Sequence, residues 1–344
     1  MAELALDWQA PFTVNVLLSM SVHRRGGGDP TFRLDRRGAL WRTTLTPEGP
    51  ATIRVITRSA GPGAGVVEGG VDGGGDGGEG DGADGGRGDG GVGTGGGTVV
   101  FAQAWGPGAR WLLDVLPAQL GAYDEGVLPH GSGPGAALLR DIARRYASLR
   151  IGQTRRVFES LVPAVLEQKV VGKEAWRAWR SLLYKFGTPA PGPAPEGMRV
   201  FPPPAVWIRI PSWDWHRAGV EGIRAQTIMN AARVASRLEE IATLSHAEAD
   251  SVLRSLPGIG PWTSAEVRQR ACGDPDAVSV GDYHLPKAVG WTLAGERGTD
   301  DVGMLTLLAP YQGQRYRVQR LIELGGSPPP RRGPRNSVRD YRTF

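Results

Sequence analysis

A glycine-containing turn and a downstream aspartate are the residues of this chain best suited to chemistry. The turn is the run Leu-Pro-Gly-Ile-Gly-Pro-Trp-Thr at 256–263, and Asp282 follows 22 residues after Gly260. Gly258 and Gly260 allow a tight hairpin in which unshielded backbone N–H groups, including that of Ile259, can approach an anion. A phosphate of a nucleic-acid backbone suits such a hairpin, and Asp282 supplies a carboxylate farther along the chain.

Helical periodicity on both sides of the turn predicts a helix-hairpin-helix. Apolar residues recur at helical spacing over 247–256, where Pro257 ends the helix, and again over 262–271. The second helix, with Thr263 in its first turn, would direct its positive end toward the same anion. The alternative is a glycine-rich connection between two packed helices that binds no ligand.

The string Leu-Pro-Gly-Ile-Gly-Pro-Trp-Thr-Ser-Ala resembles the helix-hairpin-helix DNA glycosylase superfamily, in particular its DNA-3-methyladenine glycosylase II branch, which excises alkylated bases. The resemblance covers about residues 130–326. In that family an aspartate essential for base release begins a helix beyond the hairpin. The segment Val-Ser-Val-Gly-Asp-Tyr-His-Leu at 278–285 places Asp282 at that point. The resemblance therefore implies that Asp282 is catalytic.

The chemistry of base release supports a role for Asp282 without reference to the family. Breaking the bond between a base and its deoxyribose leaves positive charge on the sugar, which an ionised carboxylate stabilises. As the predicted N-cap of a helix over 283–293, this carboxylate would accept backbone N–H bonds that favour its charged form. Two alternatives stay open: Asp282 only caps the helix, or it also orients or deprotonates the attacking water.

Two differences from other branches of the family narrow the mechanism. Branches that also cut the strand have a Schiff-base lysine in the second helix of the motif, where this chain has Trp262. Another branch holds an iron-sulfur cluster through four cysteines, whereas this chain has only Cys272. The resemblance implies a monofunctional enzyme with no cofactor and no iron-sulfur cluster, and it leaves open a structural monovalent cation at the hairpin.

Aromatic side chains are expected to hold the extruded base. A methylated purine is electron-poor, so electron-rich rings suit it. Trp262 matches a tryptophan of the alkylation-repair branch, and Tyr283 and Trp213 are further candidates for the base pocket. Packing in the core is the alternative for each ring. Glu266 stands where the best-known member has an aromatic residue, so the pocket wall is expected to differ.

Base flipping leaves a gap in the duplex that a side chain usually fills. The segment 157–168 resembles the family helix that leads to the plugging residue, which makes Gln168 and Lys169 the candidates. Relatives often use leucine or glutamine at the position of Lys169. The alternatives are that Lys169 lies along a phosphate, or that it is a solvated residue at a helix end.

The charge of the chain is unevenly distributed. The formal net charge is +5, but the segment 61–97 carries seven acidic residues and one arginine, which leaves +11 on the remainder. A basic remainder suits polyanionic DNA, although scattered arginines are common on soluble proteins. The same segment holds 21 of the 52 glycines and no aromatic residue, a composition typical of disorder. The basic tail 327–344 is also expected to be disordered.

The pattern of the whole chain predicts an α+β fold class. Residues that favour strands gather at 12–18, 52–56 and 98–102, with a helix over 110–116 or 118–122. Helices are predicted over 138–149, 155–171, 173–186, 224–241, 247–256, 262–271, 283–293, 300–308 and 312–324, with an extended loop over 188–204. We expect an antiparallel sheet domain (1–130) with a disordered Gly-rich insert (61–97), an all-α domain (131–326) and the basic tail.

These observations predict an enzyme that acts on double-stranded DNA containing damaged bases. No apolar window is long enough for a membrane span, a single cysteine fits a reducing cytoplasm, and five histidines without paired spacing offer no metal site. We expect a cytoplasmic, nucleoid-associated monomer. Two alternatives remain: a non-catalytic helix-hairpin-helix protein that binds damaged or structured DNA, and a glycosylase for a deaminated or oxidised base.

Overall fold

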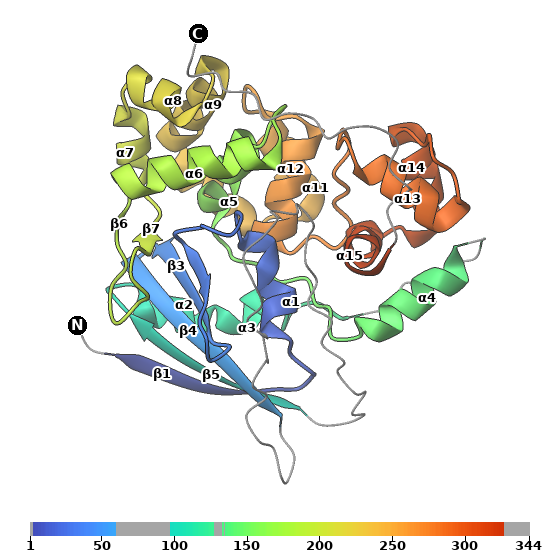
Figure 1. Ribbon diagram of the computed structural model, residues 1–344, viewed down its shortest axis with the longest axis horizontal. Helices are drawn as coiled ribbons and strands as arrows, with labels where there is room; N and C mark the ends of the chain where they lie inside the picture. Colours follow the sequence, from blue (N-terminus) through green and yellow to red (C-terminus); the bar gives the residue numbers. More distant parts are fainter. Residues whose placement is uncertain (1–2, 60–96, 127–132, 134, 327–344) are drawn as a thin grey trace, which may run out of the picture.

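A computed structural model describes residues 3–59, 97–126, 133 and 135–326. One five-stranded sheet forms in the N-terminal part, and helices follow (Figure 1). This arrangement confirms the predicted α+β class, in which the sheet comes first. The predicted disordered segment 61–97, except Gly97, and the predicted disordered tail 327–344 lie outside the described residues.

The sheet is antiparallel throughout, with the strand order β1-β5-β4-β3-β2. Side chains alternate along β5, so that Val100 and Ala102 are buried while Val99 and Phe101 are partly exposed. This alternation is typical of an antiparallel sheet with one covered face. The predicted strands at 52–56 and 98–102 are confirmed. The strands are β1 (Leu4–Ala10), β2 (Phe32–Leu34), β3 (Leu40–Thr46), β4 (Gly49–Ser59) and β5 (Thr98–Trp105).

Two short helices, α2 (Ala109–Asp114) and α3 (Leu116–Gln119), cover the buried face of the sheet. Leu112 and Leu116 from these helices share one core with Ile53 of β4. The sequence left open which of two segments forms a helix here. The chain forms a helix in each region, with bounds that differ by one to three residues.

The predicted strand over 12–18 is wrong. After β1 the chain forms helix α1 (Val16–Met20) and one turn of 3-10 helix, η1 (Ser21–His23). The Asn15 side chain caps α1 because it accepts a hydrogen bond of 2.9 Å from the Leu18 N–H. The cap favours a helix in a segment whose residue types favour a strand.

The helical body contains a helix in each region where the sequence predicts one, usually with shorter ends. Helix α5 lies at its centre, since every residue from Val157 to Leu166 except Glu159 is buried. Helices α7 and α8 were not predicted, because they begin at Pro204 and beside Pro211 in a proline-rich region, where proline fits a first turn. The helices are α4 (Ala136–Arg145), α5 (Val157–Leu166), α6 (Gly172–Phe186), α7 (Pro204–Arg209), α8 (Ser212–Ala218), α9 (Gly222–Arg233), α10 (Ala235–Glu239), α11 (His246–Arg254), α12 (Pro261–Val267), α13 (Leu285–Ala294), α14 (Asp301–Leu308) and α15 (Arg315–Gly325). The predicted loop 188–204 contains a small antiparallel pair, β6 (Thr188–Pro189) and β7 (Arg199–Val200).

Two hydrophobic cores divide the helical body. The first is built around α5 and includes α6, α9, α11 and α12. The second gathers residues of α4, α13, α14 and α15. The predicted hairpin belongs to the first core, whereas the helix that follows Asp282 belongs to the second. Any site that uses both must therefore lie where the two cores meet.

Ion pairs join the sheet to the central helix. Arg42 of β3 pairs with Glu159 of α5 at 3.1 Å, and Arg25 pairs with Glu167 at 3.3 Å. All four side chains are largely buried. Because a buried charge is costly unless it is paired, these contacts hold the sheet in one position on α5.

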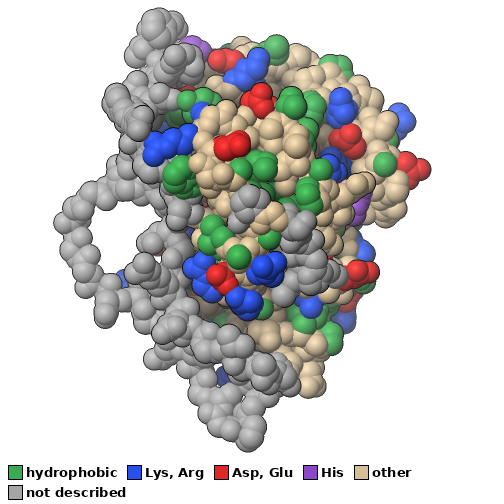
Figure 2. Space-filling view, turned by 90° about the vertical axis from the view of Figure 1, so that its right-hand side faces the viewer, with side chains coloured by type: hydrophobic (Ala, Val, Ile, Leu, Met, Phe, Trp, Pro, Cys, Tyr) green, Lys and Arg blue, Asp and Glu red, His purple; other side chains and the backbone are tan. Residues whose placement is uncertain are grey.

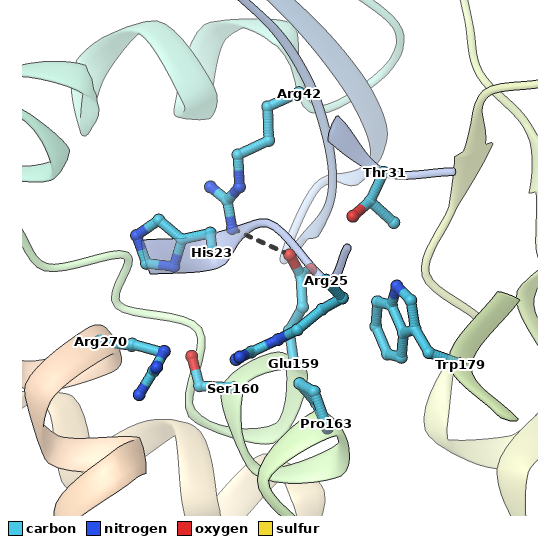
Figure 3. Close-up of a pocket in the computed structure, with 9 residues that line it drawn as sticks. All are labelled: His23, Arg25, Thr31, Arg42, Glu159, Ser160, Pro163, Trp179 and Arg270. Atoms are coloured by element: carbon cyan, nitrogen blue, oxygen red, sulfur yellow. Dashed lines mark hydrogen bonds and ion pairs between the residues drawn. The ribbon is translucent and has the colours of Figure 1, made fainter. Parts of the chain in front are cut away.

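A small polar cavity lies in the same interface (Figure 3). Its volume of about 20 Å³ is enough for roughly one water molecule. The guanidinium groups of Arg25, Arg42 and Arg270 and the imidazole of His23 line it. Burial, together with the charges of these arginines, holds the pKa of His23 well below its usual value. The imidazole is therefore neutral at neutral pH and adds no charge to the interface.

Within the described residues, no helix has both the length and the apolar character needed to cross a membrane.

The pairing of β4 with β5 predicts that most of segment 61–97 is dispensable for folding. Ser59 and Thr98 are the last partners of the ladder, so the two ends of the segment leave the sheet side by side. Replacing residues 63–96 with a short Gly-Ser linker should leave cooperative thermal unfolding intact, because shortening a loop changes its closure entropy little. The melting temperature of the shortened protein checks this, and a loss of cooperative unfolding would contradict it.

Candidate active site

The hairpin predicted from the sequence is present between α11 and α12. A capping box starts α11, in which Ser245 and Glu248 bond each other's backbone N–H groups. The chain turns after Arg254, and α12 begins at Pro261, one residue before the predicted start. The helix-hairpin-helix is therefore confirmed, with Pro261 in the first helical turn, where a missing N–H has no cost.

The two glycines of the hairpin have different roles. Gly258 has a φ of +89°, and a side chain there would place its Cβ 2.3 Å from Thr227 Oγ1 of α9. Gly260 is extended, and an added Cβ would meet nothing within 4 Å. Gly258 thus lets the hairpin pack on α9, whereas Gly260 leaves the backbone open to solvent or to a ligand.

The backbone donors of the turn are largely available to an anion. The N–H groups of Gly258, Gly260 and Trp262 have no hydrogen-bond acceptor within the described part of the chain. Ile259, also a predicted phosphate contact, donates its N–H to the Leu256 carbonyl at 3.1 Å, and its side chain is buried. The open donors therefore lie on either side of Ile259.

The two predicted plug residues differ in their surroundings. The Gln168 amide donates to the Gly258 carbonyl at 3.0 Å and to Thr263 Oγ1 at 2.9 Å, so it fastens the α5–α6 loop to the hairpin. Thr263 is only 2% exposed, which leaves its backbone rather than its hydroxyl for a ligand. Lys169 is exposed and has a φ of +57°, a left-handed conformation that is uncommon outside glycine.

Asp282 lies on a turn that begins at Ser279. The Asp282 N–H donates to the Ser279 carbonyl at 3.2 Å, and Gly281 in between has a φ of +94°. The Gly281 N–H donates to Asp301 Oδ1 of α14 at 3.0 Å, which fixes the turn from the other side. The conformation of Gly281 is one that other residues adopt with strain, so the turn specifies glycine before the aspartate.

One carboxylate oxygen of Asp282 is held and the other is open. Asp282 Oδ1 accepts the N–H groups of His284 at 2.7 Å and Leu285 at 2.8 Å. Helix α13 begins at Leu285 with His284 as its N-cap residue, so the prediction that Asp282 is itself the N-cap is wrong by two residues. Asp282 Oδ2 accepts no hydrogen bond from the described residues. The half-buried carboxylate therefore keeps one oriented oxygen for a reaction.

The Asp282 turn approaches the first turn of the hairpin helix α12. A Cβ built on Gly281 would stand 4.0 Å from the Cβ of Trp262. Trp262 is partly buried and packs against the first hydrophobic core. The structure therefore brings Trp262, the open N–H groups of the hairpin and Asp282 into one region, although 22 residues separate Gly260 from Asp282 in the chain.

The other aromatic candidates are exposed. Tyr283 is 67% exposed, and the ammonium of Lys287 lies 3.8 Å from its ring centroid. Trp213, on α8, is 64% exposed, and no described contact joins it to Asp282 or Trp262. Of the three predicted pocket residues, Tyr283 directly follows Asp282 and Trp262 lies near Gly281, whereas no described contact joins Trp213 to either of them.

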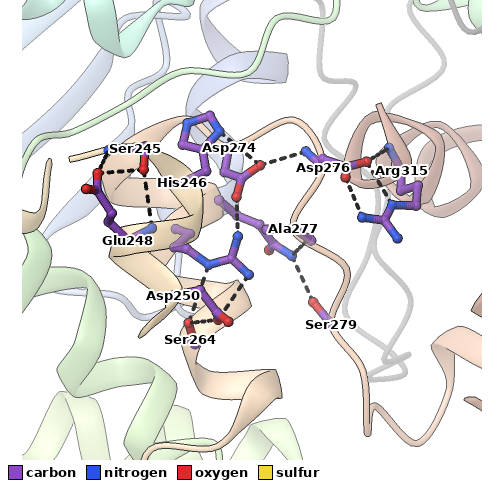
Figure 4. Close-up of polar contacts among 12 residues, drawn as sticks. Ser245, His246, Glu248, Asp250, Ser264, Asp274, Asp276, Ala277, Ser279 and Arg315 are labelled. Carbon is purple, nitrogen blue, oxygen red and sulfur yellow. Dashed lines mark hydrogen bonds and ion pairs between the residues drawn. The ribbon is translucent and has the colours of Figure 1, made fainter. Parts of the chain in front are cut away.

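A polar network beneath the turn was not anticipated from the sequence (Figure 4). Gln269 donates to the Ala277 carbonyl at 2.7 Å and to Ser279 Oγ at 2.9 Å. Arg315 of α15 holds Asp276 by a hydrogen bond of 2.9 Å from its Nε and by an ion pair. Burial alone would raise the pKa of Asp276, but the hydrogen bonds and charge of Arg315 hold it below its usual value. The segment before Asp282 is thus fixed at several points.

Arg268 ties the same segment to both helices of the hairpin motif. It pairs with Asp250 of α11 at 3.3 Å and with Asp274. Five residues from Arg268 to Cys272 form a π-helix, η3, which continues α12. Such widened turns are often found at functional sites. No short sequence pattern signals these contacts, because the partners lie on separate elements.

Glu266 does not form an open pocket wall. It is 8% exposed and its carboxylate is bonded to Arg270 and Ser279, both at 2.7 Å. Instead of lining an open pocket, the Glu266 carboxylate faces the loop that carries Asp282.

The described residues offer no metal site built from side chains. They contain no group of three or more His, Cys, Asp or Glu that could hold a metal ion. A monovalent cation at the hairpin would depend on backbone carbonyls, and those of Leu256 and Gly258 already accept hydrogen bonds from Ile259 and Gln168. We derive no step through a cation.

Charged side chains of both signs are interspersed on the face seen in Figure 2, without a single large basic patch. At the hairpin, the open backbone N–H groups and the start of α12 are the groups suited to a phosphate.

Comparison with known proteins gives relatives of one kind. Over 151 residues the chain is 31% identical to a protein of two Mycobacterium tuberculosis strains named probable bifunctional transcriptional activator/DNA repair enzyme AlkA. The match covers 43% of this chain and 29% of the relative, so the chain matches less than a third of the length of these curated relatives. No protein-family model matches the chain.

Solved structures with the same fold include two DNA glycosylases. The 3-methyladenine DNA glycosylase of Archaeoglobus fulgidus superposes with a TM-score of 0.65 at 17% identity, covering 93% of this chain and 97% of that one. The 8-oxoguanine glycosylase/lyase of Clostridium acetobutylicum, solved with double-stranded DNA, gives a TM-score of 0.60 at 13% identity, covering 90% and 91%. At these identities the likeness establishes the fold.

The contrast between the two hairpin glycines predicts their effects on stability. Gly258→Ala should destabilise the fold by roughly 1–3 kcal/mol, because alanine there has an unfavourable φ and meets Thr227. Gly260→Ala should leave stability within about 0.5 kcal/mol of the parent. Chemical denaturation of the two variants side by side measures the difference, and equal stabilities would contradict the distinction.

Proposed function

We propose that this chain, which shares its fold with solved DNA glycosylases, is a monofunctional helix-hairpin-helix DNA glycosylase of base excision repair. The proposed reaction is hydrolysis of the N-glycosidic bond of flipped-out alkylated bases, such as 3-methyladenine or 7-methylguanine, in duplex DNA. One observation carries the proposal: an aspartate with one fixed and one open oxygen lies on a turn that approaches a hairpin with free N–H groups at Gly258 and Gly260.

The hairpin would hold the DNA backbone near the lesion. The free N–H groups of Gly258 and Gly260, with the start of α12, suit a phosphate oxygen. Gln168 and Thr263 support this turn from behind. Phosphate contacts position the duplex without reading its sequence, so this part of the site serves any lesion.

Lys169 is the side chain that we propose enters the gap left by the flipped nucleotide. It is exposed at the tip of the α5–α6 loop, and its neighbour Gln168 is fastened to the hairpin. A strained backbone at an exposed position is often associated with function. Gln168 would have to break two hydrogen bonds to act as the plug, which favours Lys169.

Asp282 would stabilise the sugar as the base leaves. Positive charge develops on the deoxyribose as the N-glycosidic bond breaks, and a fixed carboxylate oxygen nearby lowers the barrier. The hydrogen bonds to Oδ1 orient the group before substrate arrives. A water molecule then attacks the sugar carbon and gives an abasic site. Helix α12 contains no lysine that could form a Schiff base, so the strand should remain intact.

Trp262 and Tyr283 are proposed to flank the extruded base. Trp262 contacts the Asp282 turn, and Tyr283 is the residue after the carboxylate. Lys287 lies over the ring of Tyr283 and would have to move for a cationic base to stack there. This observation favours keeping a neutral base, oxidised or deaminated, as the second candidate substrate class.

A panel of labelled duplexes tests the proposed function. Each duplex carries one alkylated, deaminated or oxidised base and is treated with alkali after incubation, to cut at abasic sites. The proposal expects alkali-dependent cleavage at an alkylated base and none without alkali. Cleavage only at an oxidised or deaminated base would support the second candidate. Tight binding of an abasic analogue without excision of any lesion would make the protein a non-catalytic DNA binder.

Asp282→Asn tests the catalytic carboxylate. Asparagine keeps the size and much of the capping ability of aspartate but loses the negative charge, so folding and damaged-DNA binding should persist. Base release should fall by at least about two orders of magnitude. Single-turnover excision with excess enzyme gives the rate, and Lys287→Ala should cause a far smaller loss. An Asp282→Asn rate near that of the parent would refute the assignment.

Gly260→Val tests the hairpin as the phosphate site. A valine side chain has room in the free protein but would occupy the open space above the backbone N–H groups. Affinity for damaged and undamaged duplexes should fall together, by roughly tenfold or more, because the lost contact reads no base. Fluorescence anisotropy with both duplexes measures it. An unchanged affinity in a folded variant would mean that the hairpin is purely structural.

A further inference from the structure

Helix α12 carries a buried carboxylate that the proposed mechanism does not use. Glu266 lies one turn beyond Trp262 and is 8% exposed. Its Oε2 pairs with Arg270 at 2.7 Å, and its Oε1 accepts the hydroxyl of Ser279 at 2.7 Å. The first contact stays within one helical stretch, whereas the second crosses to the loop that carries Asp282.

Ser279 is the residue from which the Asp282 turn starts. Its carbonyl accepts the Asp282 N–H at 3.2 Å. Ser279 as a whole is only 1% exposed. The hydroxyl donates to Glu266 and accepts from Gln269 at 2.9 Å and from Gln319 of α15 at 3.4 Å. With its donor and acceptor positions all in use, the hydroxyl has a single favourable orientation.

We propose that the hydrogen bond between Glu266 and Ser279 sets the position of Asp282 relative to the hairpin. Glu266 and Ser279 are then positioning residues, which act on the reaction only through Asp282. This inference rests on the proposed function, because it explains how the DNA-holding helix and the catalytic carboxylate are kept in register.

The division of the helical body into two cores explains why such a link is needed. Helix α12 is anchored in the first core and α13 in the second. Near the site, Gly281 approaches Trp262, and Ser279 Oγ is bonded to Glu266 of α12 and to Gln269 of η3. A van der Waals contact resists approach but not sliding, whereas a buried hydrogen bond to a charged group is short and directional.

The expected effect of losing this link is a misplaced carboxylate rather than an unfolded protein. Ser279→Ala removes the hydroxyl but leaves the backbone bond to Asp282 and the bond from Gln269 to the Ala277 carbonyl. A displacement of about 1 Å at a reacting group can lower a rate by about a hundredfold. The loss should therefore fall on base release and not on DNA binding.

Ser264→Ala is the matched control. Ser264 lies on the same helix, is fully buried, and its hydroxyl also donates to a carboxylate, that of Asp250, at 2.7 Å. That bond joins α12 to α11. Both variants thus lose a buried hydroxyl that donates to a carboxylate, and only Ser279 is also bonded directly to Asp282, through its own carbonyl.

The test measures single-turnover excision on an alkylated duplex and affinity for an abasic-analogue duplex. Ser279→Ala should lower the excision rate by about 10- to 100-fold while affinity stays within about twofold, and Ser264→Ala should leave both near the parent. In an Asp282→Asn background, Ser279→Ala should cause no further loss of rate, because a positioning residue acts through the group it positions. The inference would be overturned if the double variant were slower than Asp282→Asn by the full factor that Ser279→Ala causes alone. It would also be overturned if Ser279→Ala excised at the parent rate.

Amide hydrogen exchange separates this inference from the proposed function. In Ser279→Ala the N–H groups of Gly281 and Asp282 should exchange faster than in the parent, while those of α11 stay unchanged. If the parent excises no lesion, the proposed function fails, and exchange alone decides whether the link positions the turn. Unchanged exchange at both amides would overturn the inference whether or not the protein is an enzyme.

Discussion

The close approach of the Asp282 turn to helix α12 is the constraint on which the rest of the site depends. Gly281 has a φ of +94°, a backbone conformation that favours glycine, and a Cβ at this position would only just reach the Cβ of Trp262, at 4.0 Å. The carboxylate is then held from its own side by the first N–H groups of α13. The hairpin proposed to bind the DNA backbone and the oxygen proposed to react can stay together because both are attached to rigid elements that meet at this point.

The remainder of the fold supplies that rigidity. Helix α5 is buried along nearly its whole length, and its end carries the loop in which Gln168 fastens to the hairpin. The sheet binds to the same helix through Arg42 and Glu159. Through these connections the N-terminal sheet covers and stiffens the helix beneath the site, and it supplies none of the candidate catalytic groups.

The sequence was most informative where the determining interactions are local. The hairpin depends on glycines, prolines and caps within a few residues and was placed correctly from the string at 256–263, whereas the predicted N-cap position of Asp282 was wrong by two residues. Local signals failed where they compete, as at Asn15, whose cap forms a helix among strand-favouring residues. The bond between Glu266 and Ser279 could not be foreseen, because only the packing of two cores brings these side chains together.

The most direct test is the structure of the protein bound to a duplex that carries a cationic azasugar in place of the damaged nucleotide. Asp282 Oδ2 should lie about 3 Å from the charged ring nitrogen, and a phosphate oxygen of the same strand should lie about 3 Å from the Gly260 nitrogen. Both distances must hold in one complex. A bound azasugar with Asp282 turned away, or a backbone that passes the hairpin without contact, would contradict the account.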